Sequence, residues 1–174
     1  ETLKAQVAQQ QGMQILLTAI NKDFAQLNTI SNQMLAAKEQ RFKAQSSAAA
    51  LTITFNEQLR ELSNRLLDIE LINVESNQQS LLNAVFGTAT RVDDLLFTLN
   101  NNVKGIGQIT TSENINDHQQ DTSFLLDNIK SNLSYLEQQA APIANKLNAN
   151  ELITAFNDLS SLLNNPDGLY ALQN

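Results

Sequence analysis

The chain has 174 residues, of which 42% are apolar, and a formal net charge of −7, with one histidine and no cysteine. This length suffices for one domain with a buried core, and the acidic balance argues against a nucleic-acid partner, because phosphate binding requires a basic face. The lack of cysteine excludes thiol catalysis, disulfides and cysteine-type metal sites.

Turn-forming residues are scarce, since the chain has two prolines and five glycines. A β-protein needs turn residues about every ten residues, so this composition predicts an all-α fold with few, long helices. Helices with apolar stripes and short corners pack as antiparallel bundles. We therefore expect an elongated antiparallel bundle of the four-helix type, with helices long enough to belong to a rod of two stacked bundles.

The first predicted helix spans residues 1–44. From residue 13 onward its apolar residues follow a seven-residue repeat, in which two core positions alternate at spacings of four and three residues. Before Gly12 apolar residues are sparse, so we expect that stretch to lack some of its packing partners. One core position holds Met13, Ile20, Leu27 and Met34, and the other holds Leu17 and Phe24.

The second predicted helix spans residues 48–104 and follows a corner at Ser46 and Ser47, because a serine hydroxyl is a good N-cap. Between its two apolar halves the heptad phase shifts over residues 73–80, which locally unwinds a coiled coil. This shift places Asn73 and Asn77 where apolar side chains are expected. The apolar positions are Phe55, Leu59, Leu62, Leu66 and Ile69, then Leu81, Val85, Val92, Leu95, Leu99 and Val103.

The third predicted helix spans residues 114–147, after a Gly- and Thr-containing loop. Pro142 lies within it and should kink or restart it, because proline lacks the backbone donor and clashes with the preceding turn. The fourth helix spans residues 150–165, and Asp167 would cap a further helix that starts at Gly168. The predicted core positions are Leu126, Ile129, Leu133, Leu136, Ala140, Ile143 and Leu147, then Leu152, Phe156, Leu159 and Leu163.

Three polar residues lie closest to the expected core: Asn73, Asn77 and Thr88. They are candidates for a ligand pocket or for a weakly packed polar layer that switches between two arrangements. The alternatives are that a buried amide fixes the helix register, or that a hairpin corner exposes the two asparagines.

The sequence offers few of the side chains that catalysis requires. The one histidine, His118, stands at the polar start of the third helix, where capping or solvent exposure is expected. A transition-metal site would lack ligands without a second histidine or a cysteine. We therefore predict no catalytic, cofactor-binding or metal-binding residues, no cofactor and no enzymatic activity.

Three stretches support a family resemblance: Arg65-Leu66-Leu67-Asp68-Ile69-Glu70-Leu71-Ile72-Asn73-Val74, residues 95–102, and Asp167-Gly168-Leu169-Tyr170-Ala171-Leu172. Together with the shifted seam between them, they resemble the periplasmic helical-bundle sensor domains of bacterial transmembrane receptors. The nearest likeness is to the trimethylamine N-oxide sensor histidine kinases (TorS) and their relatives. The resemblance implies that residues 1–174 are one sensor-domain fragment that lacks the family's first and last helices and its kinase module.

The same resemblance implies a role in two-component signal transduction. The fragment would belong to the periplasmic part of an inner-membrane protein, linked to the membrane only through flanking spans outside this chain. It would bind a periplasmic binding protein of the TorT type and transmit a change of helix packing, in a receptor that is a homodimer. Two alternatives remain: a direct small-molecule sensor of the chemoreceptor kind, although no inward arginine is visible at the heptad positions, and a structural coiled-coil segment.

Overall fold

The computed structural model describes residues 2–106 and 112–172, and every regular element within them is helical. The expected all-α helical bundle is confirmed. The chain divides into two compact units, Glu1–Ala44 and Gln45–Asn174. The elements are α1 (Thr2–Leu67), α2 (Gln79–Ile106), α3 (Ser112–Ala140) and α4 (Ala149–Asn164), with the 3-10 helices η1 (Asp68–Leu71), η2 (Ser76–Gln78) and η3 (Ala141–Ile143).

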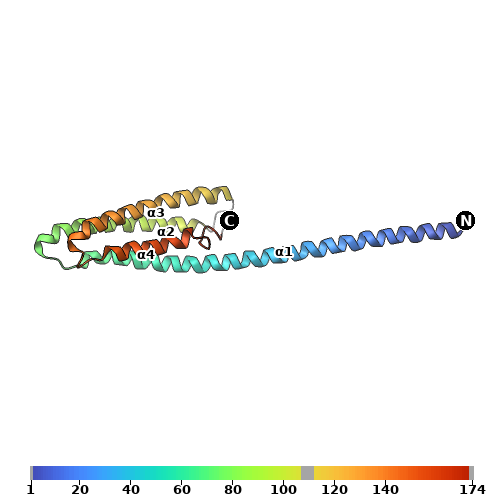
Figure 1. Cartoon of the computed structure of the whole chain (residues 1–174), viewed down its shortest axis with the longest axis horizontal. Coiled ribbons are helices and arrows are strands. Elements are labelled where there is room, and N and C mark those ends of the chain that lie inside the picture. The colour runs from blue at the N-terminus through green and yellow to red at the C-terminus, as the bar shows by residue number, and fades with distance from the viewer. Residues whose placement is uncertain (1, 107–111, 173–174) are drawn as a thin grey trace. The chain divides into compact units, whose positions relative to one another are not determined.

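The second unit is an antiparallel four-helix bundle, formed by the last part of α1 together with α2, α3 and α4 (Figure 1). Its helices are amphipathic, and their apolar faces meet in one core. Within this unit, the predicted core positions from Phe55 to Ile69 and from Leu126 to Leu163 are confirmed as buried, except that Leu147 is half-buried. The confirmed positions are Phe55, Leu59, Leu62, Leu66, Ile69, Leu126, Ile129, Leu133, Leu136, Ala140, Ile143, Leu152, Phe156, Leu159 and Leu163.

The core face of α2 differs in part from the predicted one. The sequence offers two adjacent leucines at 81–82 and again at 95–96. The structure buries Leu82 and Leu96, and leaves Leu81 and Leu95 half-buried. The buried set repeats at spacings of three and four without a gap, which is the pattern of a helix face in a bundle. That set is Leu82, Val85, Ala89, Val92, Leu96, Leu99, Val103 and Ile106.

The predicted corner at Ser46 and Ser47 is wrong, because α1 is helical throughout Thr2–Leu67. Serine caps a helix only where the backbone already leaves helical geometry, and three alanines follow here, which are the best helix formers. No glycine or proline stands between residues 12 and 87 to force an interruption. The predicted boundary between a helix over residues 1–44 and a helix that starts at residue 48 is therefore absent.

The predicted helix over residues 48–104, whose continuity through residues 73–80 the shifted heptad left open, is interrupted there. The chain leaves α1 at Leu67, passes through η1, takes extended geometry at Ile72 and Glu75, and re-enters a helix at Gln79. Asn73 and Asn77 are exposed on this corner. A buried unpaired amide is costly to desolvate, so the chain turns where the apolar repeat fails, and the shift in heptad phase marks a hairpin corner.

Pro142 ends α3 earlier than the predicted residue 147. The α-helix stops at Ala140, and Pro142 stands inside η3, exposed to solvent. Proline fits the first turn of a helical segment, where a missing donor breaks no hydrogen bond. Ile143 beside it remains buried, so the apolar repeat continues past the point where the α-helix has ended.

Up to residue 172 the segment after α4 forms turns and no assigned helix, although the Leu172 amide donates to the Gly168 carbonyl at 3.2 Å, as in a single turn of the helix predicted to start there. The segment folds back as a series of turns, in which the amides of Leu169 and Tyr170 donate to the carbonyls of Leu162 and Leu163 at 2.9 and 3.3 Å. These bonds satisfy carbonyl groups that the end of a helix leaves unpaired. A Cβ atom on residue 168 would lie 2.7 Å from the Leu163 carbonyl oxygen, so only glycine fits there.

The first unit, Glu1–Ala44, is helical over its described residues. Thirteen of its large apolar side chains are between 49% and 77% exposed, including every residue of the predicted heptad seam. None of the described helices combines the length and apolar character needed to cross a membrane. The unit thus presents a regular apolar face that is open to solvent.

Candidate functional site

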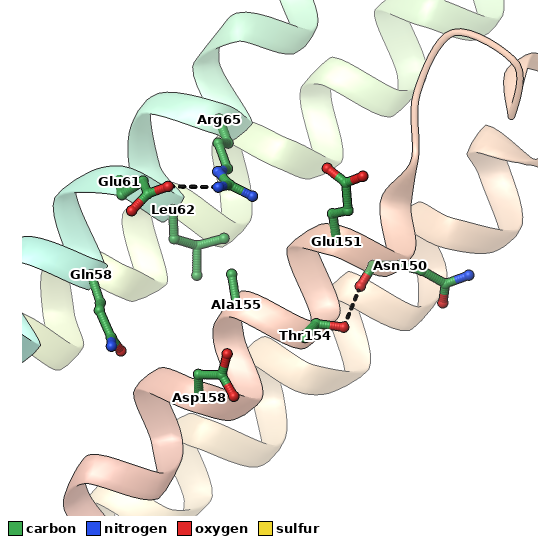
Figure 2. A pocket seen from close by; sticks show the side chains of 9 residues that line it. All are labelled: Gln58, Glu61, Leu62, Arg65, Asn150, Glu151, Thr154, Ala155 and Asp158. Carbon is green, nitrogen blue, oxygen red and sulfur yellow. Dashed lines mark hydrogen bonds and ion pairs between the residues drawn. The ribbon is translucent and has the colours of Figure 1, made fainter.

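A groove of about 530 Å3 separates α1 from α4 within the second unit. Figure 2 shows its two walls, with Leu62 of α1 and Ala155 of α4 facing one another at its floor. Because the two helices are antiparallel, residues early in one wall lie opposite residues late in the other. The lining comprises Gln58, Glu61, Leu62 and Arg65 from α1, and Asn150, Glu151, Thr154, Ala155 and Asp158 from α4.

The charged groups of the groove are partly paired. Arg65 donates to Glu61 at 2.5 Å, one helical turn away, and both side chains are largely exposed (Figure 2). Such exposed pairs contribute about 0.3–0.5 kcal/mol to stability. The Glu151 carboxylate accepts a hydrogen bond of 2.9 Å from the side-chain amide of Asn148, near the start of α4. A carboxylate at this end of a helix is favoured by the helix dipole. The groove therefore has a mainly acidic rim with one guanidinium on the α1 wall.

Gln58 gives the groove an unsatisfied polar atom. Its side-chain oxygen is buried and has no hydrogen-bond partner among the described residues. A buried acceptor left unpaired costs about 1–3 kcal/mol. Sequence reasoning did not single out Gln58, since glutamine is frequent throughout the chain.

The second candidate surface is the exposed apolar seam of the first unit. We use "exposed seam" for Met13, Leu17, Ile20, Phe24, Leu27 and Met34, which share one face of the helix at heptad spacing and are each more than half exposed. The exposed seam is flanked by Leu16, Ile30 and Leu35, which are exposed to solvent to a similar degree. A face of this extent on one helix marks an interaction surface.

The predicted polar layer is not assembled. Asn73 and Asn77 are exposed on the corner between α1 and α2, where the Asn73 carbonyl accepts a bond of 2.8 Å from the Lys146 ammonium. Thr88 is buried on α2 and donates to the Gln139 side-chain oxygen of α3 at 2.7 Å. The alternative that a corner exposes the asparagines is the one the structure supports.

A polar cluster that the sequence did not reveal ties the C-terminal turns to α3. The Tyr170 hydroxyl donates to Thr122 at 2.6 Å and lies 2.7 Å from Nδ1 of His118. Both Tyr170 and Thr122 are buried, and His118 is half-buried rather than solvent-exposed or capping as expected. Burial raises the pKa of Tyr170, the hydrogen bond with Thr122 lowers it, and the Asp121 charge raises it further, with a net upward shift.

The Tyr170 cluster joins two chain segments. It pairs its own polar atoms, and no groove that we describe opens onto it. No group of three or more carboxylate or imidazole side chains gathers at one point in residues 2–106 and 112–172. What the described surfaces offer is binding, through a mixed-charge groove and an apolar helix face.

Comparisons with known proteins add no identification. No protein-family model matches the chain, and no curated protein or solved structure matches it significantly.

Proposed function

We propose that this chain is a fragment of the extracytoplasmic sensor domain of a two-component histidine kinase receptor. In this proposal it binds a periplasmic binding protein and transmits a change of helix packing toward the membrane. The observation that carries the proposal is the exposed seam on α1, because α1 also supplies Phe55, Leu62 and Leu66 to the bundle core. One helix thus has both a packed and an unpacked apolar face, which suits a protein that acts through helix association.

The proposed signalling mechanism relies on how a packed helix bundle responds to a displacement at one site. Packed cores do not deform continuously, so a small displacement at one site is passed on as a shift of a whole helix by about 1–2 Å. The groove beside α1 is where a bound partner would act on that helix. Its α1 wall carries an exposed ion pair worth well under 1 kcal/mol, which a partner can break and replace at low cost.

The gene that encodes the parent protein provides the first test. The proposal predicts an apolar run of about 20 residues on each side of this segment, followed by a kinase module. The second test is saturable binding of a periplasmic binding protein by the chain, with altered amide exchange in residues 55–66. A parent gene without flanking spans would contradict the sensor proposal and favour a structural coiled-coil segment.

A second candidate function is direct sensing of a small molecule, and the groove favours it specifically. The missing inward arginine argued against this function, but Arg65 lines the groove, together with the polar side chain of Gln58. Calorimetry with small amines, amine oxides and organic acids separates the two candidates. Saturable binding without any partner protein, abolished in Gln58→Leu and retained in the exposed control Gln138→Leu, would establish the second candidate over the first.

A further inference from the structure

The groove between α1 and α4 contains two carboxylates that no cation balances. On the α1 wall, Arg65 is already paired with Glu61 at 2.5 Å, which is the one ion pair in the described part of the chain. On the α4 wall, Glu151 and Asp158 have no such partner, and the Asn148 amide that donates to Glu151 is uncharged. A concave site lined mainly by one sign of charge concentrates ligands of the opposite sign. The groove therefore favours a cation.

The two unbalanced carboxylates stand at opposite ends of the groove. Glu151 and Asp158 are separated on α4 by two helical turns, so both lie on one side of the helix, about 10 Å apart along its axis (Figure 2). A metal ion requires its oxygen ligands within about 2.6 Å, and the described residues contain no group of three or more side chains that could hold one. The spacing fits a linear ligand with a positive group at each end.

Between the two carboxylates the groove is apolar or already satisfied. Leu62 and Ala155 form its floor, and the Thr154 hydroxyl donates to the Asn150 carbonyl at 2.9 Å (Figure 2). A methylene chain can lie there because it needs no hydrogen-bond partner, whereas a buried polar group would. We propose that the groove binds a linear diamine, with one ammonium group at each unbalanced carboxylate. This assignment rests on the second candidate function, the direct sensing of a small molecule.

Charge argues against the other classes of small ligand. A ligand carboxylate would need Arg65, whose guanidinium is paired with Glu61 and lies opposite Glu151 across the groove (Figure 2). Residues 45–174 carry fifteen acidic and six basic side chains, so the field of the whole second unit also opposes anions. A monoamine balances one of the two carboxylates and leaves the other. A diamine balances both.

Calorimetry of the whole chain with three matched probes tests the proposal. Cadaverine has an ammonium group at each end of a pentyl chain, pentylamine has one on the same chain, and glutarate has two carboxylates in place of the ammonium groups. We expect cadaverine to bind saturably with one molecule per chain, and no binding of glutarate. Cadaverine should bind about fivefold more tightly than pentylamine, as one further solvent-exposed ion pair allows.

Charge-removing variants locate the binding. Asp158→Asn and Glu151→Gln should each weaken cadaverine binding about fivefold. The control Asp94→Asn removes the same charge from an exposed position of α2 outside the groove, and should change the affinity less than about twofold, through the net charge alone. Arg65→Gln should strengthen cadaverine binding, because Glu61 then has no competing cation. All four side chains are exposed, and circular dichroism checks that helical content is kept.

Equal affinities for cadaverine and pentylamine, equal losses in Asp158→Asn and Asp94→Asn, or weaker cadaverine binding in Arg65→Gln would overturn the proposal. Binding of glutarate or an amine oxide in place of cadaverine, lost in Gln58→Leu, would overturn the ligand class and leave the second candidate function standing. Binding of trilysine alone would overturn it in favour of a basic protein partner. If neither amines, amine oxides nor organic acids bind, the diamine assignment and the second candidate function both fail.

Discussion

The Tyr170 hydroxyl makes hydrogen-bond contacts that tie the last described residues to the bundle. It joins Thr122 and His118 on α3 to the turns that follow α4, at 2.6 and 2.7 Å. Because Thr122 is fully buried, loss of its partner leaves a hydroxyl without a bond and away from water. The cluster therefore fixes the end of the described chain on the bundle.

Tyr170→Phe is expected to lower the free energy of unfolding by about 1–2 kcal/mol, the cost of leaving a buried polar group unpaired. Urea unfolding at neutral pH measures this loss. The control is Tyr135→Phe, at an exposed position of α3, which should change stability by less than about 0.5 kcal/mol. Equal effects of the two variants would show that the cluster contributes nothing beyond ordinary surface polarity.

The raised pKa of Tyr170 also predicts that the folded chain loses stability at alkaline pH. The pKa of Tyr170 is raised above its ordinary value of 10.0, chiefly by burial. A group with a raised folded-state pKa contributes stability that is fully present below its unfolded value and is lost as pH rises through the folded value. The native chain should therefore lose stability above about pH 10 more steeply than Tyr170→Phe. Parallel profiles for the two proteins would be inconsistent with this shift.

The three predicted polar residues, Asn73, Asn77 and Thr88, should differ in how much their substitution lowers the stability of the fold. Thr88→Val removes the bond to Gln139 from a buried position and should cost about 1 kcal/mol. Asn73→Ala and Asn77→Ala alter exposed side chains on the corner and should stay within about 0.5 kcal/mol of the native chain. Thermal unfolding of the three variants side by side checks this. A large cost at either asparagine would indicate a buried polar layer after all.

At the scale of elements, α1 contains a matched pair of phenylalanines in opposite environments. Phe55 is fully buried in the bundle, whereas Phe24 in the exposed seam is 65% exposed. Phe55→Ala should lower the free energy of unfolding of the bundle by about 3–5 kcal/mol, and Phe24→Ala by less than about 0.5 kcal/mol. Denaturant unfolding at low protein concentration measures both, and comparable losses would contradict the division of α1 between two environments.

The sequence predicted the helical faces better than the helix ends. The faces of α3 and α4 follow a repeat that survives Pro142, because side-chain burial depends on the spacing of apolar residues and not on unbroken backbone bonds. Corners depend on smaller differences. Ser46 and Ser47 lie in a continuous helix, whereas Asn73 and Asn77 lie on a corner, since only the second pair interrupts the apolar repeat.

The candidate sites were less accessible to sequence reasoning. The exposed seam was visible as a heptad, but its solvent exposure was not, because a spacing does not say whether a partner is present. Tyr170 bonds to residues far away in the sequence, on α3, and Arg65 lines a groove whose other wall is α4, so no local pattern marks either site. Gly168 was expected to start a helix, and its tight approach to the Leu163 carbonyl became clear only in three dimensions.

At the scale of the whole molecule, residues 45–172 bury a core of their own, whereas residues 2–44 form a helix whose apolar seam is open. An isolated helix in water is stabilised little by propensity alone, since most helical stability comes from packing of the apolar face. The first unit should therefore depend on association for its order, and the second should not. The two units differ in what stabilises them, although one helix, α1, runs through both.

Amide hydrogen exchange of the full chain, resolved by peptide and measured at low and at high protein concentration, tests this account most directly. The account predicts slow exchange in residues 126–136 at both concentrations. It predicts fast exchange in residues 13–34 in the dilute sample, and protection of that segment alone as concentration rises. Exchange in residues 13–34 as slow as in residues 126–136 in the dilute sample would contradict it.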